Sequence, residues 1–276
     1  MPNLTIIGNL IFDSILKVEN IKFNKSNKII HSSYRLGGVA NYKRALDKLD
    51  VSSNCIGYCG DDDYASFILK ESNLINTTCF QVKNSKSAVA RILVDEQNSE
   101  RTSFVDWGLY NKYIAKFDDF GSVKKHLHIA YIDTFKIDAT LLKTLKSHGI
   151  KISADFCGAY IFDDLYQYLE TVIPILEVAF ISEEDYLDLP ERIKTLLLNI
   201  TLIRHCPKKT ILRTMNKDIV VQNKQYVSES NINVLGAGDI YASHILKGFL
   251  EDKMDLYTLT EHAQRETLKD LINESS

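Results

Sequence analysis

The sequence predicts an α/β fold in which a doubly wound, mostly parallel sheet is flanked by helices and accompanied by a small β-sheet. Two observations predict it. Apolar runs of strand length alternate with segments whose apolar residues recur at helical spacing, the pattern of helices covering a parallel sheet. Late in the chain, the small residues of Gly236-Ala237-Gly238-Asp239 open an amphipathic run over 240–250, which indicates a helix that begins at an anion pocket.

The alternation begins near the N-terminus. A strand is predicted over 4–7, and the Lys- and Asn-rich stretch over 18–33 is expected to be irregular, with short exposed strands of a small accessory sheet. Periodicity then predicts, in order, a helix over 39–49, a strand over 51–56 and a helix over 64–70. Three consecutive strands, separated by turn residues, are predicted over 77–82, 88–94 and 101–105.

The second half returns to strands and helices in alternation. The predicted elements are a strand over 126–132, a helix over 139–148, a strand over 150–155, a helix over 162–172, a strand over 178–181 and a helix over 191–198. Strands over 201–205, 210–214 and 219–222 precede the Gly236 turn, and a last helix is predicted over 256–272. This order places helices over a parallel sheet.

Composition restricts the partners. The 276 residues are 45% hydrophobic and 25% charged, which is enough to bury a large core in one domain. The net charge of −3 and the scattered Lys and Arg give no support for nucleic acid or a membrane as partner, so we expect a small-molecule substrate. No apolar window reaches membrane-span length, and we expect a cytoplasmic protein. The five cysteines lack CxxC spacing, which favours reduced thiols over a zinc site.

The Gly236 turn combines two chemical features. Its first backbone N–H groups lack partners within the helix and face one point together with the positive end of the helix dipole. Asp239 adds a carboxylate beside that point. This arrangement suits phosphoryl transfer, in which N–H groups hold the migrating charge and a carboxylate accepts a proton from the attacking hydroxyl. The alternative is an ordinary helix start with a favourable acidic residue in its first turn.

Five short motifs occur in order along the chain. They are Gly8-Asn9 with Asp13, Leu36-Gly37-Gly38-Val39-Ala40-Asn41, Ile56-Gly57-Tyr58-Cys59-Gly60-Asp61-Asp62, Asn98-Ser99-Glu100-Arg101-Thr102 and Gly236-Ala237-Gly238-Asp239. In this order they resemble the ribokinase-like, or PfkB-type, carbohydrate kinases. The second is similar to the GGxxxN segment of that family, with Asn41 one place early, and the last matches the core of DTxGAGD.

The resemblance implies a single ribokinase-like domain over 1–276, with a β-lid from about 14–36 and 86–106. It implies ATP and Mg²⁺, a sugar acceptor, and Asp239 as the general base beside an anion hole at Gly236, Ala237 and Gly238. Asp13, Gly37, Gly38 and Asn41 would lie at the sugar. The alternatives for Asp13 and Asn41 are a cap or loop acid and a helix-start amide. Family members dimerise through the lid, which makes a homodimer a further expectation.

The chain departs from the family pattern at four places. Asn233-Val234 replaces Asp-Thr before the GAGD core, which puts activation by potassium in doubt. Ser182 and Asp185 stand where NxxE would serve magnesium, with a helix N-terminal turn as the alternative. Arg204, Lys208 and Lys209 lie at the expected nucleotide turn in place of glycines and are candidate ATP contacts; for the two lysines the alternative is a solvated hairpin tip. Near Asp155 the family's DxNxR pattern is absent.

Three functions follow from these observations. The first is an ATP-dependent kinase that phosphorylates a hydroxyl of a small sugar or sugar derivative. The second is a nucleoside kinase of the same fold, with Phe12, Tyr34 or Trp107 stacked on the base. The third is a catalytically impaired, sugar-binding relative, although such a protein would have no need of Asp239.

Overall fold

The computed structural model places a long strand, β1 (Leu4–Val18), at the centre of the fold. The structure describes residues 3–22, 24–95, 101–110, 113–116, 123–158, 164–214, 217–224 and 236–275. The other strands of the main sheet are β3 (Ser53–Cys59), β4 (Thr78–Gln81), β8 (His126–Ala130), β10 (Lys151–Asp155), β11 (Val178–Ser182), β12 (Thr201–Cys206), β13 (Lys209–Thr214) and β14 (Lys217–Gln222). They lie in the order β14-β13-β12-β11-β10-β8-β1-β3-β4, and only the β12–β13 and β13–β14 pairings of this order are antiparallel.

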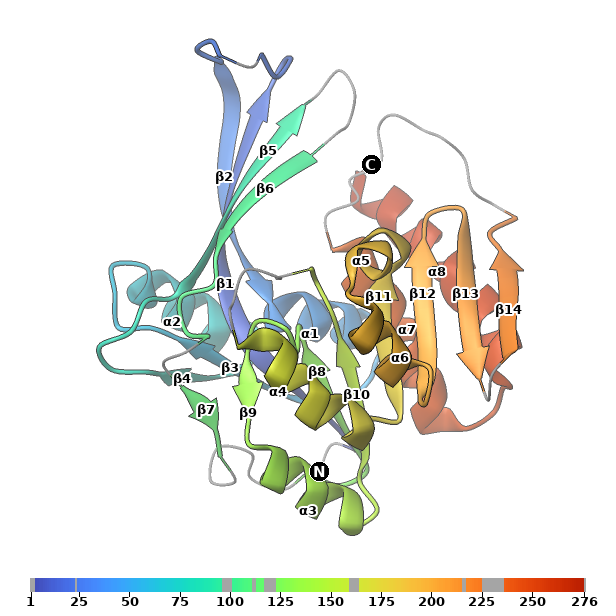
Figure 1. The fold of residues 1–276 in the computed structure, drawn as a ribbon. Helices are drawn as coiled ribbons and strands as arrows, with labels where there is room; N and C mark the ends of the chain where they lie inside the picture. The colour runs from blue at the N-terminus through green and yellow to red at the C-terminus, as the bar shows by residue number, and fades with distance from the viewer. Residues whose placement is uncertain are drawn as a thin grey trace.

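Helices cover both faces of this sheet (Figure 1). One layer contains α1 (Val39–Lys48), α2 (Ala65–Leu74), α7 (Ala237–Glu251) and α8 (Leu256–Ser275). The other contains α3 (Ala139–Ser147), α4 (Leu165–Val172) with the 3-10 turn η2 (Ile173–Ile175), α5 (Glu183–Asp188) and α6 (Glu191–Leu197). The predicted α/β fold, with a mostly parallel sheet flanked by helices, is confirmed.

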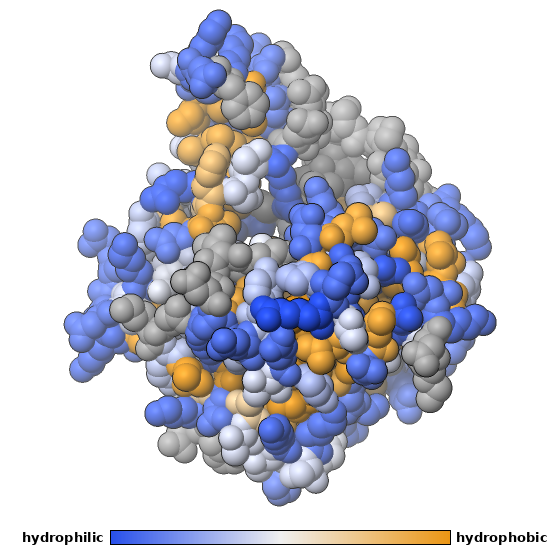
Figure 2. Space-filling model, in the orientation of Figure 1, coloured by the Kyte–Doolittle hydropathy of each residue, from blue (hydrophilic) through white to orange (hydrophobic). Residues whose placement is uncertain are grey.

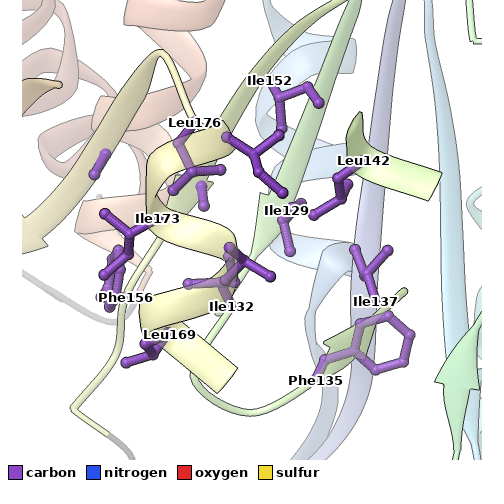
Figure 3. Packing of buried hydrophobic residues seen from close by; sticks show 14 of the residues in the cluster. Ile129, Ile132, Phe135, Ile137, Leu142, Ile152, Phe156, Leu169, Ile173 and Leu176 are labelled. Atoms are coloured by element: carbon purple, nitrogen blue, oxygen red, sulfur yellow. The ribbon is translucent and has the colours of Figure 1, made fainter. Parts of the chain in front are cut away.

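Each layer closes its own hydrophobic core. On the α3–α6 face, Ile129 and Ile152 from the strands pack with Leu142, Leu169 and Ile173 from the helices (Figure 3). Along each strand of the main sheet, alternate residues point to opposite faces. There Ile6 and Ile203 join side chains of α1 and α7, such as Leu46 and Ile245. Apolar burial on both faces explains why a strand such as β11 has a nearly continuous apolar run.

A second sheet projects from the main one and is called the projecting sheet below (Figure 1). It consists of the C-terminal half of β1, β2 (Ile29–Gly38), β5 (Ala88–Asp95) and β6 (Arg101–Asp106). From Ile11 to Val18, β1 pairs with β2 antiparallel and with β5 parallel, and β6 pairs with β5 antiparallel. Figure 2 shows the projecting sheet standing clear of the body, with a hydrophilic tip. A separate small sheet joins β7 (Ile114–Ala115) to β9 (Lys136–Ile137).

The N-terminal strands differ from the prediction. A strand expected over 4–7 continues to Val18, and the stretch expected to be irregular ends in a regular strand from Ile29. Polar residues such as Asn9 and Asp13 interrupt the apolar run, but pairing on both sides of β1 satisfies its backbone regardless of side-chain polarity. Asp13 therefore lies within a strand, neither in a cap nor in a loop.

The winding of the main sheet reverses beside β1. From β1 the chain moves outward through β3 and β4 on one side, then through β8, β10, β11 and β12 on the other. Ligands of open α/β sheets bind at the carboxyl ends of the strands at such a switch point, because connections leave it in opposite directions. The switch lies between β1 and β8.

Among the described residues, no helix is long and apolar enough to cross a membrane.

Candidate active site

Asp239 lies in the first turn of α7, and its side chain is buried. Tyr131 Oη donates a hydrogen bond of 2.6 Å to Asp239 Oδ1, and Asn41 Nδ2 donates one of 2.8 Å to Asp239 Oδ2. Burial raises the pKa of Asp239 to about 6, although both hydrogen bonds and the charge of Arg35 act to lower it. A carboxyl group with a pKa near neutrality is well matched to proton transfer at physiological pH.

The N-terminus of α7 lies beside this carboxylate. Gly236 caps the helix with a φ of 86°, in the left-handed region that favours glycine, and Ile240 N donates to Gly236 O as the first helical bond. The N–H groups of the first turn are not satisfied within a helix, and the dipole makes this end positive. With the small residues Ala237 and Gly238 following, the backbone here can be approached closely by an anion.

A cavity with mainly cationic walls adjoins the helix start. Its volume is about 70 Å³, and Arg35, Arg44 and Lys48 line it together with Asn41, Gly236 and one acid, Asp270. A Cβ atom on Gly236 would lie 3.8 Å from Arg35 Nη2 and 3.7 Å from Asp239 Oδ2, so the helix start, the arginine and the acid are near neighbours. The positive charge of Arg35 favours negative charge at Asp239.

Asp13 reaches the site from β1. Asp13 is 5% exposed, and its carboxylate accepts a hydrogen bond of 3.2 Å from Arg35 Nε on β2. Burial raises the pKa of Asp13, an effect that the charge of Arg35 only partly offsets. Two glycines permit this approach: a Cβ on Gly37 would lie 2.4 Å from Asp13 Oδ2, and one on Gly38, whose φ is 66°, would lie 2.2 Å from Asn9 O. The adjacent glycines thus bring β2 against the acid.

Two neighbouring residues of α1 donate hydrogen bonds to two buried acids. Asn41 of α1 bonds Asp239, and the next residue, Tyr42, donates to the buried carboxylate of Asp155 at the end of β10. Burial raises the pKa of Asp155 well above its ordinary value, and the charge of Asp239 adds to the increase. Asn41 therefore does more than occupy a helix start: it holds the candidate base.

Ser182 and Asp185 form a helix cap at the end of β11. Ser182 Oγ accepts from Asp185 N at 2.9 Å and donates to Asp185 Oδ2 at 2.7 Å. The loop after β10 approaches them, since a Cβ on Gly158 would lie 2.4 Å from Asp185 Oδ1. Among the described residues, no group of three or more His, Cys, Asp or Glu side chains could hold a metal ion. As magnesium ligands, Ser182 and Asp185 stay a prediction.

The predicted nucleotide turn joins β12 to β13. Arg204 is engaged within the protein: its Nη2 lies 3.2 Å from Asp218 Oδ2, and its guanidinium lies 4.4 Å from the centroid of the Tyr186 ring. Lys208 is exposed and Lys209 is half-buried. The structure does not bring these three residues into contact with Asp239, and their role toward ATP stays a prediction.

The residue beside Arg204 does reach the helix start. A Cβ on Gly238 would lie 3.4 Å from His205 Cε1, and the His205 ring packs 5.5 Å from that of Tyr241. Burial lowers the pKa of His205 to about 4, so the ring is neutral at physiological pH. The Asn233-Val234 replacement and residues 98–100 of the Asn98–Thr102 motif lie outside the described residues.

Sequence reasoning missed Tyr131 and Arg35. Tyr131 directly follows the buried strand β8. The carboxyl ends of parallel strands meet at one edge of a sheet, so this position could have identified Tyr131 as a candidate site residue. Arg35 stands two residues before the Gly37-Gly38 pair, but its direction depends on a strand register that the sequence did not reveal.

Comparison with known proteins places the chain in a family. It matches the pfkB family of carbohydrate kinases over residues 1–265 and therefore belongs to that family. No curated protein gives a significant match.

Solved structures confirm the fold. A Burkholderia thailandensis nucleoside kinase in complex with inosine is 16% identical, with a TM-score of 0.70 over 98% of this chain and 90% of that one. Ribokinase from Thermotoga maritima is 16% identical, with a TM-score of 0.69 over 97% and 92%. Ribokinase from Cryptococcus neoformans in complex with ADP is 14% identical, with a TM-score of 0.69 over 97% and 92%.

Proposed function

We propose that the protein transfers the γ-phosphoryl group of ATP to a hydroxyl of a small sugar or sugar derivative, with Asp239 as the general base. The observation that carries this proposal is the buried Asp239 carboxylate at the N-terminus of α7, oriented by Tyr131 and Asn41. The Asp239 carboxylate and the backbone N–H groups suited to an anion belong to the same helical turn. A base and a group that stabilises negative charge therefore lie together, as transfer of a phosphoryl group to a hydroxyl requires.

The chemistry follows from this geometry. The acceptor hydroxyl gives its proton to Asp239 as its oxygen attacks the γ-phosphorus, and the bond from that phosphorus to the bridging oxygen of ADP breaks. The Gly236-Ala237-Gly238 turn offers N–H groups to the equatorial oxygens, which carry the developing charge. Arg35, whose charge acts on Asp239, adds positive potential near the helix start. Asp13 and Asn41 are suited to the remaining hydroxyls, since carboxylate and amide groups bridge polyols.

Magnesium fits the donor set that the chain presents. Mg²⁺ in kinases needs only one or two protein carboxylates besides phosphate oxygens and water. Ser182 and Asp185 present oxygens at the carboxyl end of β11, and burial raises the pKa of Asp185. Bound there, Mg²⁺ would neutralise phosphate charge.

The structural neighbours support a nucleotide as donor. One ribokinase is in complex with ADP, and one nucleoside kinase is in complex with inosine. Together with the family match, these agree with a kinase whose acceptor carries sugar hydroxyls.

Acceptor-dependent release of ADP tests the proposal. The purified protein is mixed with ATP and Mg²⁺, and ADP is measured with a panel of sugars, sugar phosphates and nucleosides against a blank without acceptor. We expect release with at least one acceptor. Ligand-induced thermal stabilisation without release from any acceptor would instead support a catalytically impaired binding protein.

A further inference from the structure

The surface of the projecting sheet that faces Asp239 is polar on one half and apolar on the other. Residues that pair across neighbouring strands point to the same face. On the polar half, Asp13 of β1 is opposite Arg35 of β2. On the apolar half, Asp13 is opposite Ala90 of β5, and Ala90 is opposite Val105 of β6.

The apolar half is a packed cluster that ends in an aromatic ring. Its buried members are Ile11, Ala88, Ala90 and Ile92. Trp107, one residue beyond β6, packs against this cluster and remains partly exposed, so part of its surface is available to a ligand.

Tyr131 connects this cluster to the candidate base. The side chain of Tyr131 packs against the same apolar residues, and its hydroxyl donates to Asp239 Oδ1 at 2.6 Å. The cluster around Trp107 is therefore continuous with the catalytic end of the site and is more than a remote part of the core.

The other two aromatic candidates lie on the opposite face. Phe12 precedes Asp13 on β1 and so points away from it. The ring of Phe12 packs 5.3 Å from Tyr34, 4.7 Å from Tyr64 and 5.0 Å from Phe67. Tyr34 is 61% exposed on that face. Of the three candidates, only Trp107 belongs to the surface that faces Asp239.

We propose that the acceptor is a nucleoside whose base stacks on Trp107 while its ribose hydroxyls meet Asp13, Asn41 and Asp239. This inference rests on the proposed function and names its substrate class. A free sugar has hydroxyl groups all round, and those placed over Ala90 and Val105 would lose hydrogen bonds to water without finding partners. A nucleoside has one hydroxylated end and one flat, largely apolar end, and every base offers a π face to an aromatic ring.

The emission of Trp107 reports this contact directly, because Trp107 is the single tryptophan of the chain. Adenosine, inosine, cytidine and ribose are titrated separately without ATP, with free N-acetyltryptophanamide as the control for light absorption by the bases. We expect saturable quenching by at least one nucleoside and none by ribose. Ribose-dependent ADP release without saturable quenching by any nucleoside would overturn the nucleoside assignment and leave the kinase intact. Nucleoside quenching without ADP release from any acceptor would support the stacking contact and contradict the kinase.

Variants of Trp107 separate stacking from packing. With the nucleoside that quenches, Trp107→Ala is expected to raise KM roughly tenfold or more, with a much smaller change in kcat, and Trp107→Phe to restore most of the loss. Phe104→Ala is the matched control, because Phe104 is 59% exposed on β6 and its neighbour Val105 occupies the site-facing register. Equal increases in KM for Trp107→Ala and Phe104→Ala, or no rescue by phenylalanine, would overturn the stacking role.

Discussion

Tyr131 donates a 2.6 Å hydrogen bond to Asp239, a residue 108 positions later in the chain. The backbone of Tyr131 has a φ of 60°, a conformation that is common for glycine and unfavourable for bulky residues. The surrounding structure holds this conformation. The ring packs on the apolar cluster that contains Ile11 and Ala90, and the hydroxyl donates to Asp239. Strain of this kind is typical of positions that orient a functional group.

Tyr131→Phe should change the pH dependence of the reaction. The variant keeps the ring and removes the donor that favours the Asp239 carboxylate, so the pKa of Asp239 should rise above its value of about 6. We expect the acid limb of kcat/KM against pH to move upward by roughly one pH unit, with a smaller change on the alkaline plateau. Tyr64→Phe, on the opposite face of the projecting sheet, serves as control. An acid limb that stays in place would show that Tyr131 does not tune the base.

Asp239→Asn should abolish most turnover while the protein stays folded. An amide cannot accept the proton of the acceptor hydroxyl, and loss of a general base costs roughly a hundredfold or more in rate. Steady-state ADP release measures the effect, with circular dichroism to confirm the fold. Asp252→Asn, at the exposed C-terminal cap of the same helix, should retain full activity. Substantial turnover in folded Asp239→Asn protein would remove Asp239 from the base role.

Asp239→Asn should also become relatively more stable as pH rises. The folded-state pKa of Asp239, about 6, exceeds the ordinary value, so this group contributes most stability below about pH 4. That contribution is lost as pH rises through about 6, because the buried carboxyl must then ionise. The Tm of Asp239→Asn minus that of the native protein should therefore increase between about pH 4 and pH 8. A difference that falls with pH would contradict the raised pKa.

Gly37→Ala should weaken acceptor binding. The added Cβ would lie 2.4 Å from Asp13 Oδ2, so the carboxylate must move away from its position beside Arg35. We expect KM for the acceptor to rise roughly tenfold, and an overpacking cost in unfolding free energy of about 1–3 kcal/mol. Ser32→Ala on the same strand is the control, since Ser32 is exposed and the substitution adds no atom. An unchanged KM would show that the acceptor does not depend on Asp13.

The sequence was sufficient for the main sheet and for β5 and β6 of the projecting sheet, but not for the length of β1 and β2. Central strands such as β11 are covered by helices on both faces, and the continuous apolar run Val178-Ala179-Phe180-Ile181 is distinctive. In contrast, half of the residues of β2 are exposed, so its sequence lacks the continuous apolar run of a buried strand, and its pairing with β1 depends on the register. Exposed strands of this kind become visible only when their partner is known.

The site was predictable in part for the same reason. Asp239 belongs to a local motif in which turn, helix start and acid are consecutive residues. Tyr131 and Arg35 act through contacts across the fold, and neither residue type is unusual at its position in the chain. Ser182 and Asp185 fit both a metal ligand pattern and a helix cap by spacing alone, and the structure shows their cap hydrogen bonds.

The continuity of β1 determines how the projecting sheet can move. No loop separates the part of β1 that pairs with β3 and β8 from the part that pairs with β2 and β5. A rigid-body swing about a flexible joint would break the ladder hydrogen bonds on both sides of this strand. Any movement of the projecting sheet over the site must therefore occur by a change in the twist and bend of continuous strands. Rotation of a rigid body about a hinge is not compatible with this connection.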